Sequence, residues 1–255
     1  MKKFEPSSKN MSFDVIFFDL GSTLMYFDSS WSEILQLSSE ALTDQLNDLG
    51  YPLDKGQFTP AFQDHLQIYQ ESREIDLIEK STEKILQEEL SKFDFDTIPY
   101  SHLRLALDKM YAVSQEHWQP EKDTLSTIEK LHTQGYRLGI ISNAKDSRDV
   151  HQLIDKAAIR SFLEGIFISS DIGYRKPHPR IFTVALEEMG ANPDRTVMVG
   201  DLLDADILGA KKMKIANVWI TRRADTLRNK ICLETILPDK TISTLSELPE
   251  LLENW

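Results

Sequence analysis

The chain has very little cysteine and no long apolar segment. Its 255 residues include a single cysteine, Cys232, so an internal disulfide framework and a cysteine-rich metal site are both excluded. No segment is long and apolar enough to span a bilayer, and the lysines near the N-terminus are not followed by the apolar stretch of a secretion signal. We therefore expect a cytoplasmic protein with no membrane partner.

Positive charge is also scarce. The chain carries 29 Lys and Arg against 41 Asp and Glu, a formal net charge of -12, and its Lys/Arg runs are no longer than a pair or triplet. Such a surface repels the phosphate backbone of nucleic acids and anionic lipid headgroups. Nucleic acid is therefore not an expected partner, although local positive groups can still bind a small anion. The 6 histidines show no paired spacing for a metal site.

The remaining composition is that of an ordinary globular protein. Hydrophobic residues make up 41% of the chain and charged residues 27%, and the length suits one large domain or two modest ones. Residues 1–10 are polar and Met11 directly opens the expected first strand, so either a frayed extension or an alternative start fits this end. Nothing in the sequence fixes the oligomeric state.

The middle of the chain has helical periodicity. Between about Asp28 and Trp118, apolar residues recur at helical spacing with almost no strand pattern. The pattern predicts helices over residues 31–49, around 58–69, over 85–93 and around 103–111. The last of these helices is expected to begin near Ser101 as its N-cap. Together the helices should form a small bundle.

The rest of the chain alternates between strands and helices. A first strand is expected in the apolar run that ends at Asp19, and further strands over residues 137–142, 165–169, 196–199 and 217–220. Helices are expected over residues 124–133, 148–158, 179–189 and 204–213. This alternation predicts right-handed βαβ units and a parallel sheet covered on both faces, which is the α/β class. The bundle is then an insertion between the first strand and the rest of the sheet.

Four separated segments at the ends of expected strands carry residues with catalytic chemistry. They are Asp19-Leu-Gly-Ser-Thr-Leu24, Gly139-Ile-Ile-Ser-Asn-Ala144, Tyr174-Arg-Lys-Pro-His-Pro179 and Val199-Gly-Asp-Leu-Leu-Asp-Ala-Asp-Ile-Leu-Gly-Ala210. In an open α/β sheet, ligands bind just beyond the carboxyl ends of the strands. Asp19 and Asp201 are therefore expected to meet in one crevice.

This ordered set of segments resembles the haloacid dehalogenase-like hydrolase superfamily, in the branch whose helical cap is inserted after the first motif. The similarity runs from Met11 to the end of the chain. It implies a Rossmann-like catalytic core over residues 11–26 and 119–255, with a helical cap domain over residues 27–118. It also implies a Mg²⁺-dependent hydrolase, a phosphatase or phosphotransferase, that acts on a small phosphorylated metabolite through an aspartyl-phosphate intermediate.

The first and fourth segments fit that chemistry. Under the resemblance, Asp19 is the nucleophile that attacks phosphorus. Mg²⁺ prefers hard oxygen ligands, which Asp19, Asp201 and the backbone carbonyl of Gly21 can supply. Asp206 would support or complete this metal site, or would only cap or bridge at the start of its own helix. Under the family pattern, Asp204 is less expected than Asp206 to take part in the metal site.

The second and third segments supply groups that would hold the phosphate. Ser142 offers a hydroxyl at a strand end, and the amides of Asn143 and Ala144 would lie beside it as the next helix begins. Ser142 and Asn143 could instead serve as the N-cap of that helix. Lys176 adds a positive charge that binds the transferring group and restrains the crowded carboxylates, or it is a surface lysine. Thr23 is expected to bind substrate together with Ser142 and Asn143.

Gly21 departs from the family pattern. Phosphatases of the family usually carry an aspartate at this position, two residues after the nucleophile, which protonates the leaving oxygen and then activates water. A positioned general acid or base contributes about 10²–10⁴-fold to the rate. Two interpretations remain: a phosphohydrolase that is slow on poor leaving groups, and a weakly catalytic or non-catalytic protein that binds phosphate ligands.

Relatives with a non-acidic residue at this position include dehalogenases and phosphonate-cleaving enzymes. The dehalogenase interpretation is weakened because Asp201 and Asp206 retain the pattern of a cation site, which dehalogenases do not need. The phosphonate interpretation needs a cap lysine that forms a Schiff base. The available candidates resemble solvated helix-face charges; they are Lys55, Lys80, Lys84 and Lys92.

Overall fold

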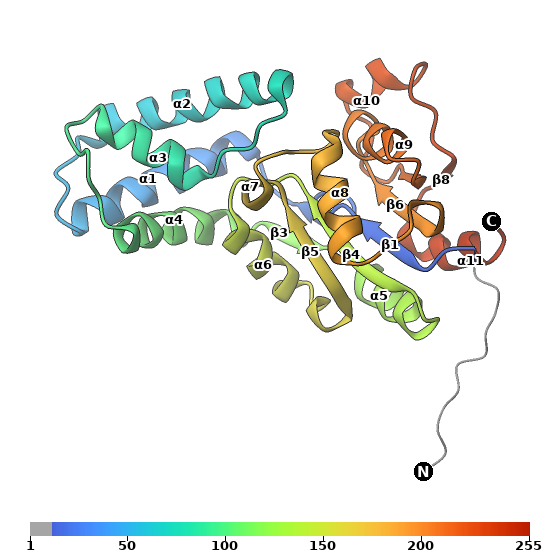
Figure 1. Cartoon of the computed structure of the whole chain (residues 1–255). Coiled ribbons are helices and arrows are strands. Elements are labelled where there is room, and N and C mark those ends of the chain that lie inside the picture. The colour runs from blue at the N-terminus through green and yellow to red at the C-terminus, as the bar shows by residue number, and fades with distance from the viewer. Residues whose placement is uncertain (1–11) are drawn as a thin grey trace, which may run out of the picture.

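The computed structural model describes residues 12–255, which are built around a six-stranded parallel sheet (Figure 1). Its strand order is β5-β4-β1-β6-β7-β8, and every neighbouring pair runs parallel. The strands are β1 (Val15–Phe18), β4 (Arg137–Ser142), β5 (Leu163–Ile168), β6 (Thr196–Gly200), β7 (Ala216–Ile220) and β8 (Lys240–Ile242). The α/β class with a Rossmann-like parallel sheet is thus confirmed. The expectations for residues 1–10 and Met11 lie outside the described residues.

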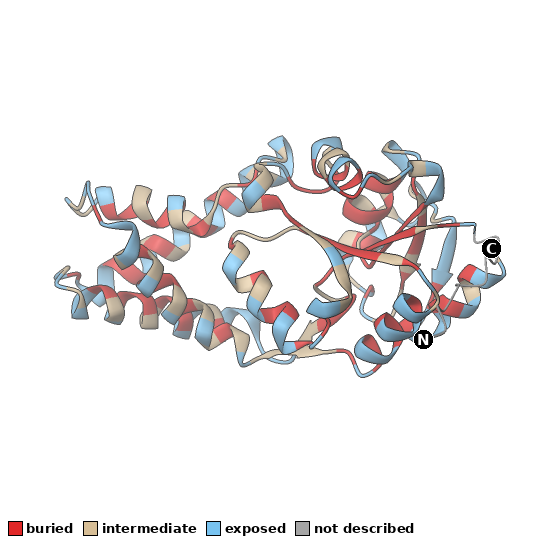
Figure 2. Cartoon of the chain, turned by 60° about the horizontal axis from the view of Figure 1, so that its bottom comes forward, coloured by how far each residue is buried: buried red, intermediate tan, exposed pale blue. Residues whose placement is uncertain are grey.

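Helices cover both faces of the sheet because side chains alternate along each strand. In β1, Ile16 and Phe18 pack in one apolar cluster, whereas Val15 and Phe17 pack in another on the opposite face. The first face is covered by α5 (Thr124–Thr133), α6 (Ser147–Lys156) and α11 (Leu248–Glu253), and the second by α8 (Pro179–Glu188) and α9 (Leu208–Lys212). Figure 2 shows the central strands buried and the outer faces of these helices exposed.

The helical stretch forms a bundle with an apolar cluster of its own. Its helices are α1 (Trp31–Asp48), α2 (Lys55–Asp76), α3 (Thr82–Ser91) and α4 (Tyr100–Gln115). Fully buried side chains from different helices meet in it; they include Leu42, Phe58, Phe62, Leu86 and Leu107. The chain enters the bundle after β2 (Met25–Phe27) and leaves it into β3 (Trp118–Pro120), and these two strands pair antiparallel. The division into residues 11–26, 27–118 and 119–255 stays a prediction.

Several local expectations were wrong. The N-cap of α4 is Pro99, not Ser101, and the helix begins at Tyr100; a proline φ of -55° already suits the start of a helix. The helix expected over residues 204–213 is divided into a π-helical turn, Leu203–Ile207, and the short α9. Strands β2, β3 and β8 and the short helices α7 (Ser169–Ile172) and α10 (Leu227–Cys232) were not anticipated, because 3 to 6 residues are too few for a periodic pattern.

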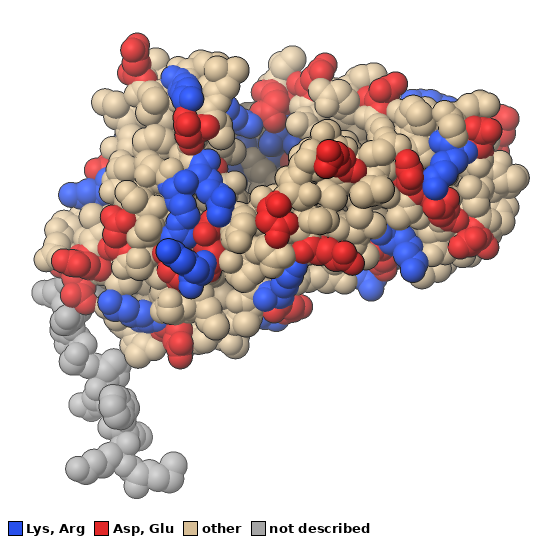
Figure 3. Space-filling model, turned by 180° about the vertical axis from the view of Figure 1, so that it is seen from behind, with Lys and Arg blue, Asp and Glu red and all other residues tan. Residues whose placement is uncertain are grey.

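The surface of the described residues shows no sign of a membrane-spanning element. None of the helices within residues 12–255 combines the length and the apolar character that crossing a bilayer requires. On the face shown in Figure 3, acidic and basic side chains are interspersed, and the surface is hollowed near its upper middle.

The bundle core gives a testable expectation. Phe62 on α2 is fully buried, so Phe62→Ala should lower the free energy of unfolding by about 3–5 kcal/mol through lost burial and a residual cavity. Ile68 lies on the same helix with 65% of its surface exposed, and Ile68→Ala should change it by less than about 0.5 kcal/mol. Urea unfolding followed by circular dichroism measures both variants. Equal losses in the two would contradict the described packing of α2.

Candidate active site

Three adjacent strands deliver the candidate residues to one edge of the sheet. Strand β1 lies between β4 and β6. Asp19 directly follows β1, Ser142 ends β4, and Asp201 directly follows β6. Since the three strands are parallel, their carboxyl ends meet, and the amide of Asp19 donates a hydrogen bond to the carbonyl of Val199 at 2.9 Å. Asp19, Ser142 and Asp201 therefore lie at the same edge of the sheet, where the sequence predicted a crevice.

Lys176 is a buried cation in this crevice and not a surface lysine. It lies between α7 and α8, and its side chain is 1% exposed. Its Nζ donates hydrogen bonds of 2.6 Å to Oδ1 of Asp19 and 2.6 Å to the carbonyl of Ile141. It also lies 2.7 Å from Oδ1 of Asp206. One ammonium group therefore binds two carboxylates from different parts of the chain.

A third carboxylate leaves the cluster with excess negative charge. Ligand atoms of Asp19, Asp201 and Asp206 lie within 4.8 Å of one another. Three carboxylates face one lysine, so when all are ionised the cluster lacks positive charge. Closely spaced carboxylate oxygens are the ligands that hard divalent cations prefer. The donor set therefore fits such a cation.

The pKa values of the cluster reflect this crowding. Burial raises the pKa of Asp19 to about 6, although the charge of Lys176 opposes the shift. Burial also raises the pKa of Asp201 well above its ordinary value, and the charges of Asp19 and Asp206 add to this. For Lys176, burial lowers the pKa, but the two neighbouring carboxylates outweigh it and leave it above its usual value. Lys176 therefore stays charged within the crowded site.

Asp206 is positioned by the turn that follows β6. Its side chain is 1% exposed, and Oδ2 accepts a hydrogen bond from the amide of Leu202 at 3.0 Å. Gly200 leaves the room for it, since a Cβ there would lie 2.3 Å from the carboxyl carbon of Asp206. Asp204 points elsewhere and accepts hydrogen bonds of 2.6 and 2.8 Å from Nε of Arg228. The structure thus groups Asp206, and not Asp204, with the other two carboxylates.

Ser142 and Asn143, in the segment at the end of β4, do not act as the expected N-cap of the next helix. Helix α6 begins after Asp146, which is its N-cap, so Ser142 and Asn143 do not cap it. The side chain of Asn143 exchanges two hydrogen bonds with the backbone of Lys176, of 2.7 and 3.0 Å. The amide of Ala144 donates to Ser169 at 2.9 Å. Asn143 therefore holds the Lys176 loop, and Ser142 lines the crevice.

Thr23 lies apart from the cavity. Its side chain is fully buried, and it is not among the residues that line the cavity containing Asp19. It is followed by Leu24, whose carbonyl accepts a hydrogen bond of 2.6 Å from the hydroxyl of Thr124. Its substrate-binding role stays a prediction.

Trp118 fills the space beside Gly21. A Cβ added to Gly21 would lie 3.3 Å from Cη2 of the Trp118 indole, closer than ordinary van der Waals contact. The indole itself packs edge-on against Phe27 with ring centroids 5.4 Å apart. Sequence reasoning treated position 21 as lacking a carboxylate, whereas the structure shows an aromatic ring beside it. No local pattern in the sequence pairs residues so far apart.

The cluster opens into a cavity of about 470 Å³ between the sheet and the bundle. Asp19, Asp201 and Lys176 line one part of it. Further lining residues come from the helical bundle, from the loop after β4 and from the segment between α7 and α8, and the sequence did not assign them a role; they include Trp31, Gln70, Arg73, Tyr111, Lys145 and Arg175. Their positions depend on tertiary packing, which strand and helix patterns do not encode. None of the four cap lysines considered above lines this cavity.

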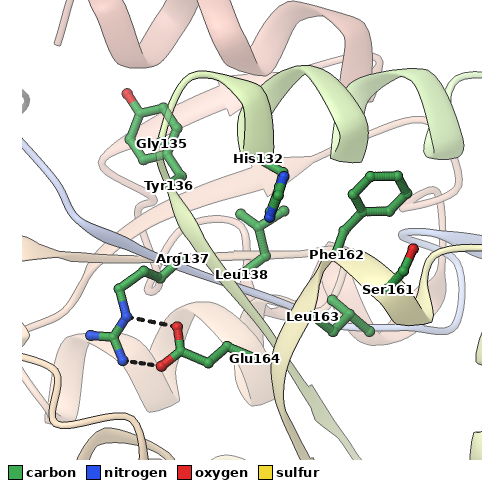
Figure 4. A pocket seen from close by; sticks show the side chains of 9 residues that line it. All are labelled: His132, Gly135, Tyr136, Arg137, Leu138, Ser161, Phe162, Leu163 and Glu164. Carbon is green, nitrogen blue, oxygen red and sulfur yellow. Dashed lines mark hydrogen bonds and ion pairs between the residues drawn. The ribbon is translucent and has the colours of Figure 1, made fainter. Parts of the chain in front are cut away.

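A second cavity, of about 310 Å³, lies where β4 and β5 begin (Figure 4). It is lined by His132, Tyr136, Arg137, Phe162 and Glu164, among others. The charges of Arg137 and Glu164 are paired, with Nε of the arginine 2.7 Å from a carboxylate oxygen. This cavity lies at the edge of the sheet opposite to Asp19, so we do not assign it to the site.

Comparison with known proteins identifies the class. The model of the haloacid dehalogenase-like hydrolase family matches residues 13–214, so the chain belongs to this family of hydrolases. A glyceraldehyde 3-phosphate phosphatase from Methanothermobacter thermautotrophicus is 28% identical over 93% of this chain and 98% of that protein. A phosphatase of the same description from Pyrococcus furiosus is 32% identical over 50% of each chain. The pyrimidine 5'-nucleotidase YjjG of Escherichia coli is 35% identical over 46% of this chain and 49% of that protein.

Solved structures show the same fold. A haloacid dehalogenase-type phosphatase from Thermococcus onnurineus has a TM-score of 0.60 and 24% identity, covering 94% of this chain and 98% of that one. A 2-haloacid dehalogenase from Pseudomonas syringae has a TM-score of 0.64 and 22% identity, covering 95% of this chain and 99% of that one. Since phosphatases and dehalogenases share the fold, the activity has to be argued from the residues of the site.

Proposed function

We propose that this hydrolase is a Mg²⁺-dependent phosphatase that acts on a small phosphorylated metabolite through an aspartyl phosphate on Asp19. The observation that carries the proposal is the buried contact of 2.6 Å between Asp19 and Lys176, placed beside Asp201 and Asp206 in a cavity of metabolite size. The relatives described as phosphatases and as a nucleotidase support the same substrate class.

The chemistry follows from the positions of the side chains. The oxygen of Asp19 that Lys176 does not hold would attack phosphorus while the bond to the leaving oxygen breaks, which gives a phosphoryl group on Asp19. Lys176 lies close enough to neutralise charge on the transferring group. Water would then attack phosphorus, release phosphate and restore the carboxylate. Asp19, Asp201 and the carbonyl of Gly21 would hold Mg²⁺, with Asp206 in support, and the ion would supply further positive charge to the phosphoryl oxygens.

The helical bundle would act as the lid of the site. Residues 27–118 contribute Trp31, Gln70 and Arg73 to the cavity wall, and β2 and β3 form the connection to the rest of the chain. Movement of the bundle at this connection would close the cavity and exclude water. We therefore assign a part in substrate selection to the bundle, and the chemistry to residues 11–26 and 119–255.

A phosphate-binding protein with little or no turnover is the second candidate. It is favoured by one observation, the Trp118 indole in the space where relatives carry the acid/base side chain. Phosphonate cleavage through one of the bundle lysines receives no such support. Lys55 lies 2.8 Å from Asp44 and Lys80 lies 3.4 Å from Glu88, both as partly exposed ion pairs.

The first experiment concerns the cation. Asp201→Asn should abolish measurable Mg²⁺ binding in titration calorimetry, because it removes one anionic ligand from a cluster of three. Asp204→Asn is the matched control, since Asp204 lies in the same loop and pairs with Arg228. It should leave the affinity within about twofold. Equal affinity in wild type and Asp201→Asn would refute the metal assignment.

The second experiment concerns the missing acid. Without a carboxylate at position 21, the leaving oxygen has to carry its own developing charge, so 4-nitrophenyl phosphate should react much faster than glycerol 3-phosphate. Gly21→Asp should raise kcat/KM for glycerol 3-phosphate, up to a ceiling of about 10²–10⁴-fold. The gain should be larger with Trp118→Phe, because phenylalanine lacks the ring carbon that lies 3.3 Å from the new Cβ.

Three outcomes separate the candidates. Slow wild-type turnover that improves in the double variant supports a phosphatase with a compromised acid step. Fast wild-type turnover of glycerol 3-phosphate, with a shallow dependence on leaving-group pKa, would show that another residue supplies the proton. Phosphate binding without any turnover that depends on Asp19 would favour the binding protein.

A further inference from the structure

Lys145 is a partly buried cation beside the candidate active site. It lies in the loop between β4 and α6 and lines the cavity that also contains Asp19. Its carbonyl accepts a hydrogen bond of 2.9 Å from the amide of Thr82, which ties this loop to the helical bundle. Within residues 12–255, its ammonium group has no hydrogen-bonded or salt-bridged acceptor. Burial lowers its pKa to about 8, and the charge of Arg73 adds to this.

Two arginines surround Lys145 with further positive charge. Arg73 from α2 and Arg175, the residue before Lys176, both line the cavity, and Arg175 is 5% exposed. The Nε atoms of both arginines are buried without a hydrogen-bond partner. Glu79 is the shared acceptor, with Oε1 2.8 Å from Arg73 and Oε2 3.6 Å from Arg175.

Glu79 is engaged by other donors and does not bind Lys145. Its Oε1 also accepts a hydrogen bond of 2.7 Å from the hydroxyl of Tyr69, and its Oε2 accepts one of 2.9 Å from Ser169. Arg175 also pairs with Glu74, but Glu74 is shared with Arg228, which lies 3.0 Å from it. Donors and positive charge therefore exceed acceptors in this part of the cavity.

The nearby aspartates do not cancel that excess. Asp146 is the N-cap of α6 and is paired with Arg104 at 2.7 Å. Asp149 accepts a hydrogen bond of 2.7 Å from Gln115, and burial raises its pKa to about 7. Arg104 thus neutralises the charge of Asp146, and Asp149 is partly protonated near neutral pH.

We propose that Lys145, with Arg73 and Arg175, binds a second anionic group of the substrate. The substrate class is then a small phosphate monoester that carries a carboxylate or a second phosphate in addition to the phosphoryl group presented to Asp19. This inference rests on the proposed phosphatase function, and it specifies which metabolites the cavity selects. A carboxylate or phosphate supplies the acceptors that these donors lack, and charged hydrogen bonds in a desolvated site are stronger than neutral ones. A neutral polyol at the same place supplies no charge to pair with the ammonium group of Lys145.

The test compares matched substrates. 3-Phosphoglycerate differs from glycerol 3-phosphate in having a carboxylate in place of a hydroxymethyl group, and fructose 1,6-bisphosphate differs from fructose 6-phosphate in its second phosphate. Wild type should prefer one of the two anionic substrates over its partner by about 10- to 100-fold in kcat/KM, mainly through KM. The pair that shows the preference identifies the anion as carboxylate or phosphate.

Lys145→Met should remove most of that preference, whereas Lys145→Arg, which keeps the charge, should retain most of it. Removing the ammonium leaves no buried acceptor unpaired, since none binds it within residues 12–255. Lys130→Met is the matched control, because Lys130 is an exposed lysine on α5 that does not line the cavity. It should behave as wild type.

The outcomes separate this inference from the proposed function. Turnover of all four esters without preference, or a preference unchanged in Lys145→Met, would overturn the second-anion site and leave the phosphatase intact. Absence of Asp19-dependent turnover would refute the phosphatase. Calorimetry with 3-phosphoglycerate and fructose 1,6-bisphosphate then decides the site by binding alone. About 10-fold weaker binding to Lys145→Met than to Lys130→Met would support it, and equal binding would refute it.

Discussion

The buried ammonium group of Lys176 is the interaction on which the rest of the site depends. It lies 2.6 Å from Asp19 and 2.7 Å from Asp206. Its positive charge offsets the repulsion between these carboxylates at the end of β1. Asn143 binds the backbone of Lys176 and thereby fixes the loop to the end of β4. With Asp201 included, the cluster still lacks positive charge, and a divalent cation would supply it.

The parts of the site that follow from strand ends were predictable from the sequence. Apolar runs that stop at Asp19, Ser142 and Asp201 indicate parallel strands, and parallel strands place their carboxyl ends together. The short strand β8 and the division of the helix around Asp206 were not predictable, because local sequence patterns do not report elements of only a few residues. Arg73 was missed for another reason, since its place in the cavity depends on how the bundle packs against the sheet.

Two unusual features line the cavity that contains Asp19. Beside Asp19, Gly21 and the Trp118 indole replace a polar acid/base group with an apolar wall. Lys145 adds positive charge and forms no hydrogen bond or salt bridge through its ammonium group within residues 12–255. Under the proposed function, the first feature would weaken catalysis on poor leaving groups, whereas the second would bind a part of the substrate that does not react. An enzyme can use such remote binding to position a substrate whose chemistry is otherwise slow.

The most direct test of the account is the mass of the peptide that contains Asp19 after acid quenching during turnover of 4-nitrophenyl phosphate with Mg²⁺. If Asp19 is the nucleophile, this peptide gains the mass of one phosphoryl group, hydroxylamine removes that group, and Asp19→Asn neither gains it nor turns over. Steady turnover with an unmodified Asp19 peptide, or activity retained in Asp19→Asn, would contradict it.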